Sequence, residues 1–179
     1  MEETHWLSAD EMSAWRKFVA VVELLPGALD SQLQRDAELS HFEYFVLAML
    51  SEAPGRTLRM TELGSETNAT LPRLSHVVSR LEKRRFVRRS PCPEDRRATN
   101  ATLTQAGWEK VVETAPGHVG AVRENVIDPL DAADIADLDR IMGRMLARLD
   151  PDSRVGILQA GGGTAATPEV GPARTSPAN

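Results

Sequence analysis

The chain has 179 residues, and its 21 Lys and Arg against 26 Asp and Glu give a formal charge of −5. A composition with 41% hydrophobic and 26% charged residues is typical of globular proteins and excludes a disordered or fibrous chain. The longest apolar run covers residues 44–50, far short of the ~18 residues that span a bilayer. Because the N-terminus is also acidic, unlike a secretory signal, we expect a cytoplasmic protein that contacts no membrane.

Positive charge is concentrated in one segment. Residues 71–97 contain nine Lys and Arg but three Asp and Glu, a net charge of +6, so the rest of the chain carries −11. A merely solvated helix face would intersperse the two signs through i,i+4 pairs. The asymmetry therefore favours a polyanion as the partner of the basic segment.

The N-terminal part predicts a long amphipathic helix. Ser8 is a candidate N-cap with Glu11 as its capping-box partner, and apolar residues recur at steps of three and four as far as Leu33. Pro26 falls inside this pattern and removes one helical hydrogen bond, so we expect a bend or break near Leu25.

A second helix is expected after Ser40. The Ser40 hydroxyl is matched by Glu43 three residues later, and Pro54-Gly55 is a strong stop signal. Residues 56–60 have room for one short extended pairing.

The basic segment begins within a predicted helix-turn-helix. A small helix over 61–67 is followed closely by another that starts at Thr70, with Pro72 in its first turn. Its expected buried stripe consists of Leu71, Leu74, Val77, Val78 and Leu81. Residues 87–90 and 99–103 are β-prone and flank a polar turn at 91–95, which predicts a hairpin.

The C-terminal part predicts two more helices and a tail. One helix opens at Thr104, with a kink expected at Pro116-Gly117, and the last starts at Asp131. Residues 150–179 are rich in small and polar residues without apolar periodicity, which predicts a disordered tail.

A helix-turn-helix followed by a basic hairpin is typical of a winged helix that binds double-stranded DNA. Within the second helix we expect Arg73, His76 and Arg80 to form one strip that reads bases, since arginine grips guanine bidentately. The other candidate contacts, several of them to phosphates, are Thr70, Pro72, Ser75, Ser79 and Lys83. In the hairpin we expect Asp95 to orient the arginines Arg96 and Arg97, one of which enters the minor groove.

Residues 58–107 resemble the winged-helix core of the MarR family of bacterial transcriptional regulators. The most specific features are RLEKR followed by an apolar pair at 80–87, the Asp-x-Arg of Asp95 and Arg97, and Leu103-Thr104 followed by Gly107. The resemblance covers about residues 8–149 and implies an obligate homodimer on a palindromic operator. It also implies that Arg97 is the minor-groove arginine. Where relatives commonly have Gly, this chain has Arg85, which costs about 1 kcal/mol in a left-handed conformation or makes the helix end differently.

Physical reasoning also favours the dimer, because the long flanking helices carry apolar stripes that nothing else in the chain covers. The expected fold class is mainly α: an α+β winged helix-turn-helix lobe flanked by dimerisation helices. We assign residues 8–39 to an N-terminal dimerisation helix region, 40–103 to the DNA-binding lobe, 104–149 to C-terminal dimerisation helices and 150–179 to the tail.

MarR relatives often bind small aromatic effectors between the lobe and the dimer helices, which implies a repressor relieved by such a molecule. Trp15, His41 and Trp108 are candidates for that pocket, although each is also explained as a core residue. No histidine pair has metal-ligand spacing, so we expect no metal or cofactor.

Three other hypotheses remain open. Cys92, near the hairpin turn, is a candidate redox sensor or an inert thiol. The chain is also consistent with a protein-interaction module that no longer binds DNA. An enzyme is disfavoured, because the sequence has no nucleophile–base set and its only glycine cluster, residues 161–163, lies in the tail.

Overall fold

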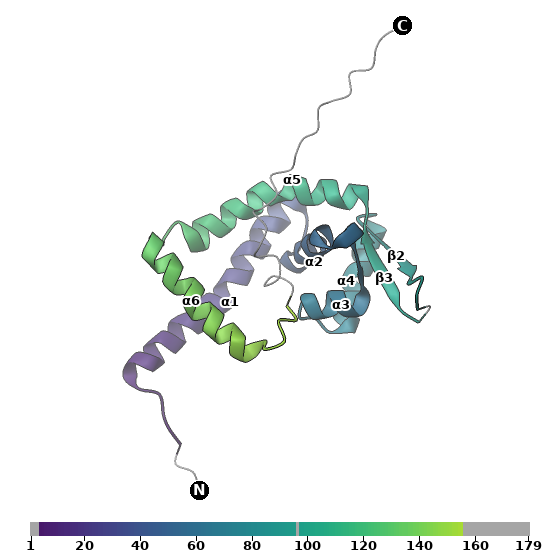
Figure 1. Ribbon diagram of the computed structural model, residues 1–179. Coiled ribbons are helices and arrows are strands. Elements are labelled where there is room, and N and C mark those ends of the chain that lie inside the picture. The colour runs from purple at the N-terminus through teal and green to yellow at the C-terminus, as the bar shows by residue number, and fades with distance from the viewer. Residues whose placement is uncertain (1–3, 96, 156–179) are drawn as a thin grey trace.

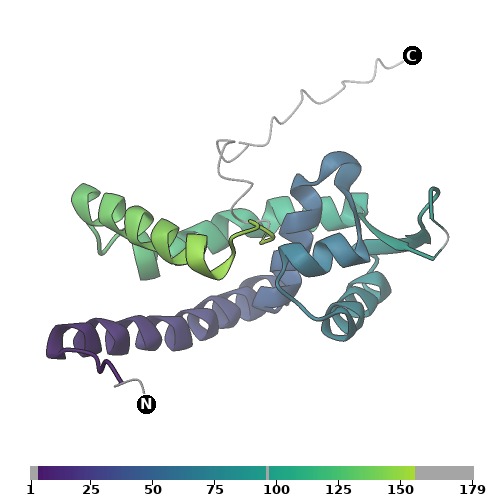
Figure 2. The same cartoon turned by 60° about the horizontal axis from the view of Figure 1, so that its bottom comes forward.

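A computed structural model describes residues 4–95 and 97–155, and Figure 1 shows a small lobe with a long helical arm. The lobe holds three helices and a three-stranded sheet, namely α2 (His41–Glu52), β1 (Thr57–Arg59), α3 (Met60–Glu66), α4 (Leu71–Lys83), β2 (Val87–Pro91) and β3 (Thr99–Leu103). The arm consists of α1 (Ala9–Ala37), α5 (Gln105–Val122) and α6 (Ala132–Leu149). In Figure 2 these helices extend away from the lobe in the same direction. The structure confirms the predicted mainly α winged-helix architecture.

Side-chain caps fix where the long helices begin. The Ser8 and Ser40 hydroxyls accept hydrogen bonds from the N–H groups of Glu11 and Glu43, whose carboxylates bond back to the cap backbone. Asp131 caps α6 in the same reciprocal way. These local motifs confirm the predicted helix starts.

Neither internal proline breaks its helix. α1 continues through Pro26, so of the bend or break expected near Leu25 the break is absent, and α5 likewise continues through Pro116-Gly117, where a kink was expected. Each proline removes one helical hydrogen bond. The packing of α1 against α5 along the arm outweighs this loss. The irregularity in this part of the chain lies instead after α5, where Arg123–Ile127 form a wide π turn.

The hydrophobic core lies within the lobe. It is built from the C-terminal end of α1, from α2, α3, α4 and the sheet, and from Val111 of α5, and its fully buried side chains include Leu33, Leu47, Leu63, Leu74 and Leu81. The sheet order is β1-β3-β2, with antiparallel pairing throughout. Val77 and Val78 are buried as expected, but Leu71 is 49% exposed. Leu71 sits in α4's first turn beside the hairpin, outside the core.

The junctions at either end of the hairpin have special backbone geometry. Arg85 adopts a left-handed conformation (φ 63°) after α4, and the N–H groups of Arg85 and Phe86 bond to the carbonyls of Glu82 and Leu81. This is a Schellman ending, which confirms the strained position expected for Arg85. At the other end, the Phe86 carbonyl lies so close to Gly107 that an added Cβ would be 2.2 Å from it.

The structure extends slightly beyond the predicted end of the arm. Asp150 is buried, and its carboxylate accepts hydrogen bonds from the N–H groups of Arg154 and Val155. Residues 156–179, on which the rest of the tail prediction falls, lie outside the described residues. Within the described residues, none of the helices is long and apolar enough to cross a bilayer, and no group of three or more metal-ligating side chains is found.

Candidate nucleic-acid interface

α3 and α4 form the helix-turn-helix. The turn is closed by hydrogen bonds from the Thr67 and Ala69 N–H groups to the carbonyls of Leu63 and Gly64. Thr70 precedes α4, but its side chain makes no capping hydrogen bond. α4 therefore begins with its first backbone N–H groups uncapped, at an exposed position suited to a phosphate.

The outward face of α4 is polar and carries one cation, Lys83. With Leu74, Val77, Val78 and Leu81 buried, the helical period places Pro72, His76, Ser79 and Lys83 opposite the core. His76 and Lys83 are exposed, while the Ser79 hydroxyl donates to the Ser75 carbonyl at 2.8 Å. This strip is what a DNA groove would meet first.

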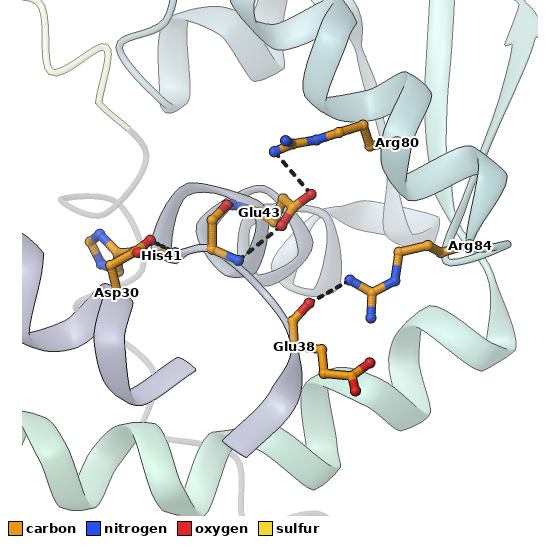
Figure 3. Close-up of polar contacts among 7 residues, drawn as sticks. Asp30, Glu38, His41, Glu43, Arg80 and Arg84 are labelled. Atoms are coloured by element: carbon orange, nitrogen blue, oxygen red, sulfur yellow. Dashed lines mark hydrogen bonds and ion pairs between the residues drawn. The ribbon is translucent and has the colours of Figure 1, made fainter. Parts of the chain in front are cut away.

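Two of the three predicted base readers lie on the flank of this face, towards α2. The Arg73 guanidinium carbon is 4.2 Å from the centroid of the Phe42 ring. The Arg80 Nη2 is 3.1 Å from Glu43 Oε1, and farther along Arg84 Nη1 donates to the Glu38 carbonyl at 2.7 Å (Figure 3). The expected strip of Arg73, His76 and Arg80 is therefore divided, with only His76 facing outward without such a contact.

The hairpin stands beside the opposite flank of α4. A hollow of about 260 Å³ separates the two, and its lining includes Leu71, Ser75, Arg89 and Arg97. Arg97 is exposed, and its backbone N–H donates to Asp95 Oδ1 at 3.0 Å. Asp95 thus shapes the turn through the backbone, whereas the sequence suggested a bond to a guanidinium. Arg96 lies outside the described residues.

Glu82 fastens the hairpin to α4. Its Oε1 accepts the Arg89 backbone N–H, and its Oε2 accepts Nε and Nη2 of the same side chain. These hydrogen bonds lower the pKa of Glu82, which keeps it ionised. Sequence reasoning missed this contact, since it joins a helix to the following strand across seven residues.

Cys92 lies buried in the hairpin. The backbone N–H groups of Glu94 and Asp95 are the main cause that lowers the pKa of its thiol, and the Arg59 guanidinium adds to the effect against the opposing influence of burial. A lowered thiol pKa favours the redox hypothesis, whereas burial shields the sulfur from oxidants.

The three predicted pocket residues have separate surroundings. Trp15 is 53% exposed and neighbours Phe18 on α1, while Trp108 stacks under the Arg56 guanidinium. His41 instead lies near His118, with 6.1 Å between ring centroids. The structure thus does not join them into one site around a common ligand.

A buried polar cluster at the crossing of α1, α2 and α5 was not foreseen. Gln32 Oε1, Thr114 Oγ1 and His118 Nδ1 are buried with no hydrogen-bond partner in the described part of the chain, and the Tyr44 ring lies 4.7 Å from that of His118. Burial lowers the pKa of His118, and its neighbour His41 lowers it further. No sequence signal links these residues, because they come from three different helices.

Comparison with known proteins identifies the family to which this winged-helix fold belongs. The MarR family model matches residues 39–99. Over 87% of its length, the chain is 45% identical to Sco3205, a MarR family transcriptional regulator from Streptomyces coelicolor solved in complex with DNA, with a TM-score of 0.80 and 96% of that chain covered. The chain belongs to the MarR family of transcriptional regulators.

A second MarR-family structure and one curated relative are also similar to this chain. AbsC from Streptomyces coelicolor is 38% identical, with a TM-score of 0.77, and the match covers 82% of this chain and 98% of that one. The HTH-type transcriptional repressor YetL of Bacillus subtilis (strain 168) is 31% identical over 93 residues, 50% of this chain and 56% of YetL. The match spans about half the length of the curated relatives. MarR membership confirms the resemblance found in residues 58–107.

Proposed function

We propose that this MarR-family chain is a dimeric, sequence-specific DNA-binding regulator, a repressor released by a small-molecule effector, and not an enzyme. The observation that carries the proposal is the polar outward face of α4, with His76 and Lys83 exposed, beside an arginine-bearing hairpin in a chain 45% identical to a regulator solved with DNA. In this proposal α4 enters the major groove and the hairpin reaches the minor groove.

The proposed DNA contacts divide by role. His76 reads base edges, while Thr70, Pro72, Ser75, Ser79 and Lys83 fix the register on phosphates and sugars. Arg97, with Arg96, enters the minor groove, whose negative potential attracts guanidinium groups. Arg73 and Arg80 border the interface from the α2 side, where their side chains are already engaged.

The proposed dimer uses the arm. α6 has no buried residue, although its apolar side chains recur at helical spacing, and α1 exposes Trp15, Val21, Val22 and Leu24. Between α1 and the segment from η2 (Arg123–Ile127) to α6 lies a hollow of about 440 Å³ lined almost entirely by apolar residues. A second copy would cover these surfaces and hold two α4 helices about 34 Å apart. In this division residues 8–39 and 104–149 dimerise and 40–103 bind DNA.

The effector is proposed to be a small aromatic molecule that contacts the arm side of the lobe. The unpartnered polar atoms of Gln32, Thr114 and His118 offer hydrogen bonds there, with His41 beside them. Such a ligand would stabilise a lobe arrangement that misfits the operator.

Selection of bound duplexes from a random pool tests the proposal directly. We expect a palindromic site, a protein dimer in solution, and an affinity that falls by about 0.9 log units per log unit of salt for each phosphate contact. A monomer, or a protein that ignores every duplex at low ionic strength, would overturn it.

A further inference from the structure

Arg80 of α4 and Arg84, the residue that follows α4, reach back to the first turn of α2 and to the end of α1 (Figure 3). Arg80 Nη2 pairs with Glu43 Oε1 at 3.1 Å, and Arg84 Nη1 donates to the Glu38 carbonyl at 2.7 Å. Positions 80 and 84 are one helical turn apart, so both side chains leave α4 on the same flank. The helix is thereby held at two successive turns.

Burial keeps Arg80 on Glu43. The Glu43 side chain is 9% exposed, against 50% for Arg80, and its Oε2 already accepts the Ser40 N–H at 2.9 Å. In the part of the chain that the structure describes, no second cation pairs with Glu43. If Arg80 turned to DNA, a nearly buried carboxylate would lose its counterion, which is strongly unfavourable.

The Arg84 contact uses the end of α1. Glu38 follows α1 in a left-handed conformation (φ 55°), and its carbonyl accepts the guanidinium where the helix dipole is negative. The Glu38 carboxylate takes no part in this bond.

The short link between α1 and α2 is firmly attached to the arm. Leu39 is fully buried, and the His41 N–H donates to Asp30 Oδ1 of α1 at 2.8 Å. A shift of the link relative to α1 would break this bond and expose Leu39. The orientation of α4 is therefore tied to α1.

We propose that Arg80 and Arg84 are positioning residues that, through Glu43 in the first turn of α2 and the Glu38 carbonyl at the end of α1, lock the orientation of α4 and so set the half-site spacing that the dimer accepts. The inference rests on the proposed DNA-binding dimer. It reassigns Arg80, which the sequence suggested as a base reader. Because α1 belongs to the proposed dimer arm, the angle between α4 and α1 determines how far apart the two α4 copies lie. Base reading is left to the outward face.

The test uses a duplex selected by the wild-type protein, a version with one base pair inserted between the half-sites, and a version with one changed base in each half-site. Fluorescence anisotropy measures the binding of E43Q, R80M, R80K and the double variant. E43Q removes the charge yet keeps a capping acceptor. E38Q is the matched control, since it neutralises a neighbouring carboxylate that Arg84 does not use. Thermal unfolding confirms that each variant is folded at the assay temperature.

We expect E43Q and R80M to lower the discrimination against the inserted base pair by the same factor, about fivefold, with no further loss in the double variant. Discrimination against the changed bases and the salt dependence stay at the wild-type values, as do all properties of E38Q. R80K, which keeps a cation for Glu43, retains most of the spacing preference. A purely structural role would lower stability and leave the spacing preference unchanged.

Three outcomes would overturn this inference without overturning the proposed function. The first is a loss of base discrimination in R80M that E43Q does not share. The second is an E43Q protein that binds more tightly with a salt slope steeper by about 0.9, which would mean that a freed Arg80 contacts phosphate. The third is a spacing preference unchanged in both variants. A wild-type protein that selects no duplex overturns the proposed function instead.

Discussion

Glu82 at the end of α4 grips Arg89 of β2 through both carboxylate oxygens, with contacts to the guanidinium at 2.7 and 3.0 Å and to the backbone N–H at 3.1 Å. The proposed groove-entering helix and the hairpin are thus joined by one side chain. Their relative placement decides whether both can meet the same duplex.

Replacing Glu82 by Gln is expected to destabilise the fold by about 1 kcal/mol, since the pair is partly exposed and screened by solvent. The folded-state pKa of Glu82 is lowered by its hydrogen bonds to Arg89, so its contribution is complete above the unfolded-state pKa and is lost as the pH falls through the folded-state value. The stabilities of wild type and E82Q should therefore converge as the pH falls. Urea unfolding of both proteins between neutral pH and pH 3 checks this expectation.

E113Q is the control for that experiment. Glu113 pairs with Lys110 on α5, and its side chain is 71% exposed. We expect a change below about 0.5 kcal/mol. A loss of stability in E113Q equal to that in E82Q would mean that the hydrogen bonds between Glu82 and Arg89 add nothing to the stability of the fold.

Gly is expected to suit position 85 better than Ala, because the backbone there is left-handed. The φ of 63° at Arg85 is unfavourable for any residue with a Cβ. R85G is therefore expected to be more stable than R85A by about 1 kcal/mol, while both lose the same charge. Thermal unfolding of the two variants isolates the backbone effect, and equal stabilities would contradict the Schellman geometry.

Much of this fold is predictable because its signals are local. Ser8 and Ser40 each carry their capping partner three residues away, and the β-prone segments flank a proline-rich turn. The family motif around Gly107 also reflects a local requirement, the close approach of Phe86.

The site was less predictable because it depends on neighbours distant in sequence. The periodicity of α4 shows which residues leave the core, but it does not show that α2 lies beside one flank. Arg80 and His76 differ by four positions and appear equivalent in the sequence, yet only Arg80 finds a carboxylate, 37 positions earlier at Glu43. His41 and His118 are likewise brought together only by helix packing.

That histidine pair makes stability depend on pH. Burial lowers the pKa of His41, although Asp30 opposes the shift, and burial together with His41 lowers the pKa of His118. The unfolded chain therefore binds more protons between the folded-state and unfolded-state pKa values, and stability falls as the pH drops through about 6.5. We expect H41Q/H118Q to lose less stability than wild type between pH 8 and pH 5.5, measured by urea unfolding. Parallel pH profiles would contradict this assignment.

Gly107 is expected to be the least replaceable residue at the start of α5. Its N–H donates to the Thr104 hydroxyl, which itself donates to the Arg85 carbonyl at 2.7 Å, so hairpin and helix meet here with no spare room. The Cβ of G107A would lie 2.2 Å from the Phe86 carbonyl oxygen and 2.7 Å from Leu103 Cδ1. The backbone must shift, which costs about 1–3 kcal/mol or more. G120A on the same helix, where a Cβ meets nothing within 4 Å, is expected to gain about 0.5–1 kcal/mol. Thermal unfolding compares the stabilities of the two variants. A G107A protein as stable as G120A would show that the strand–helix junction can accommodate a Cβ.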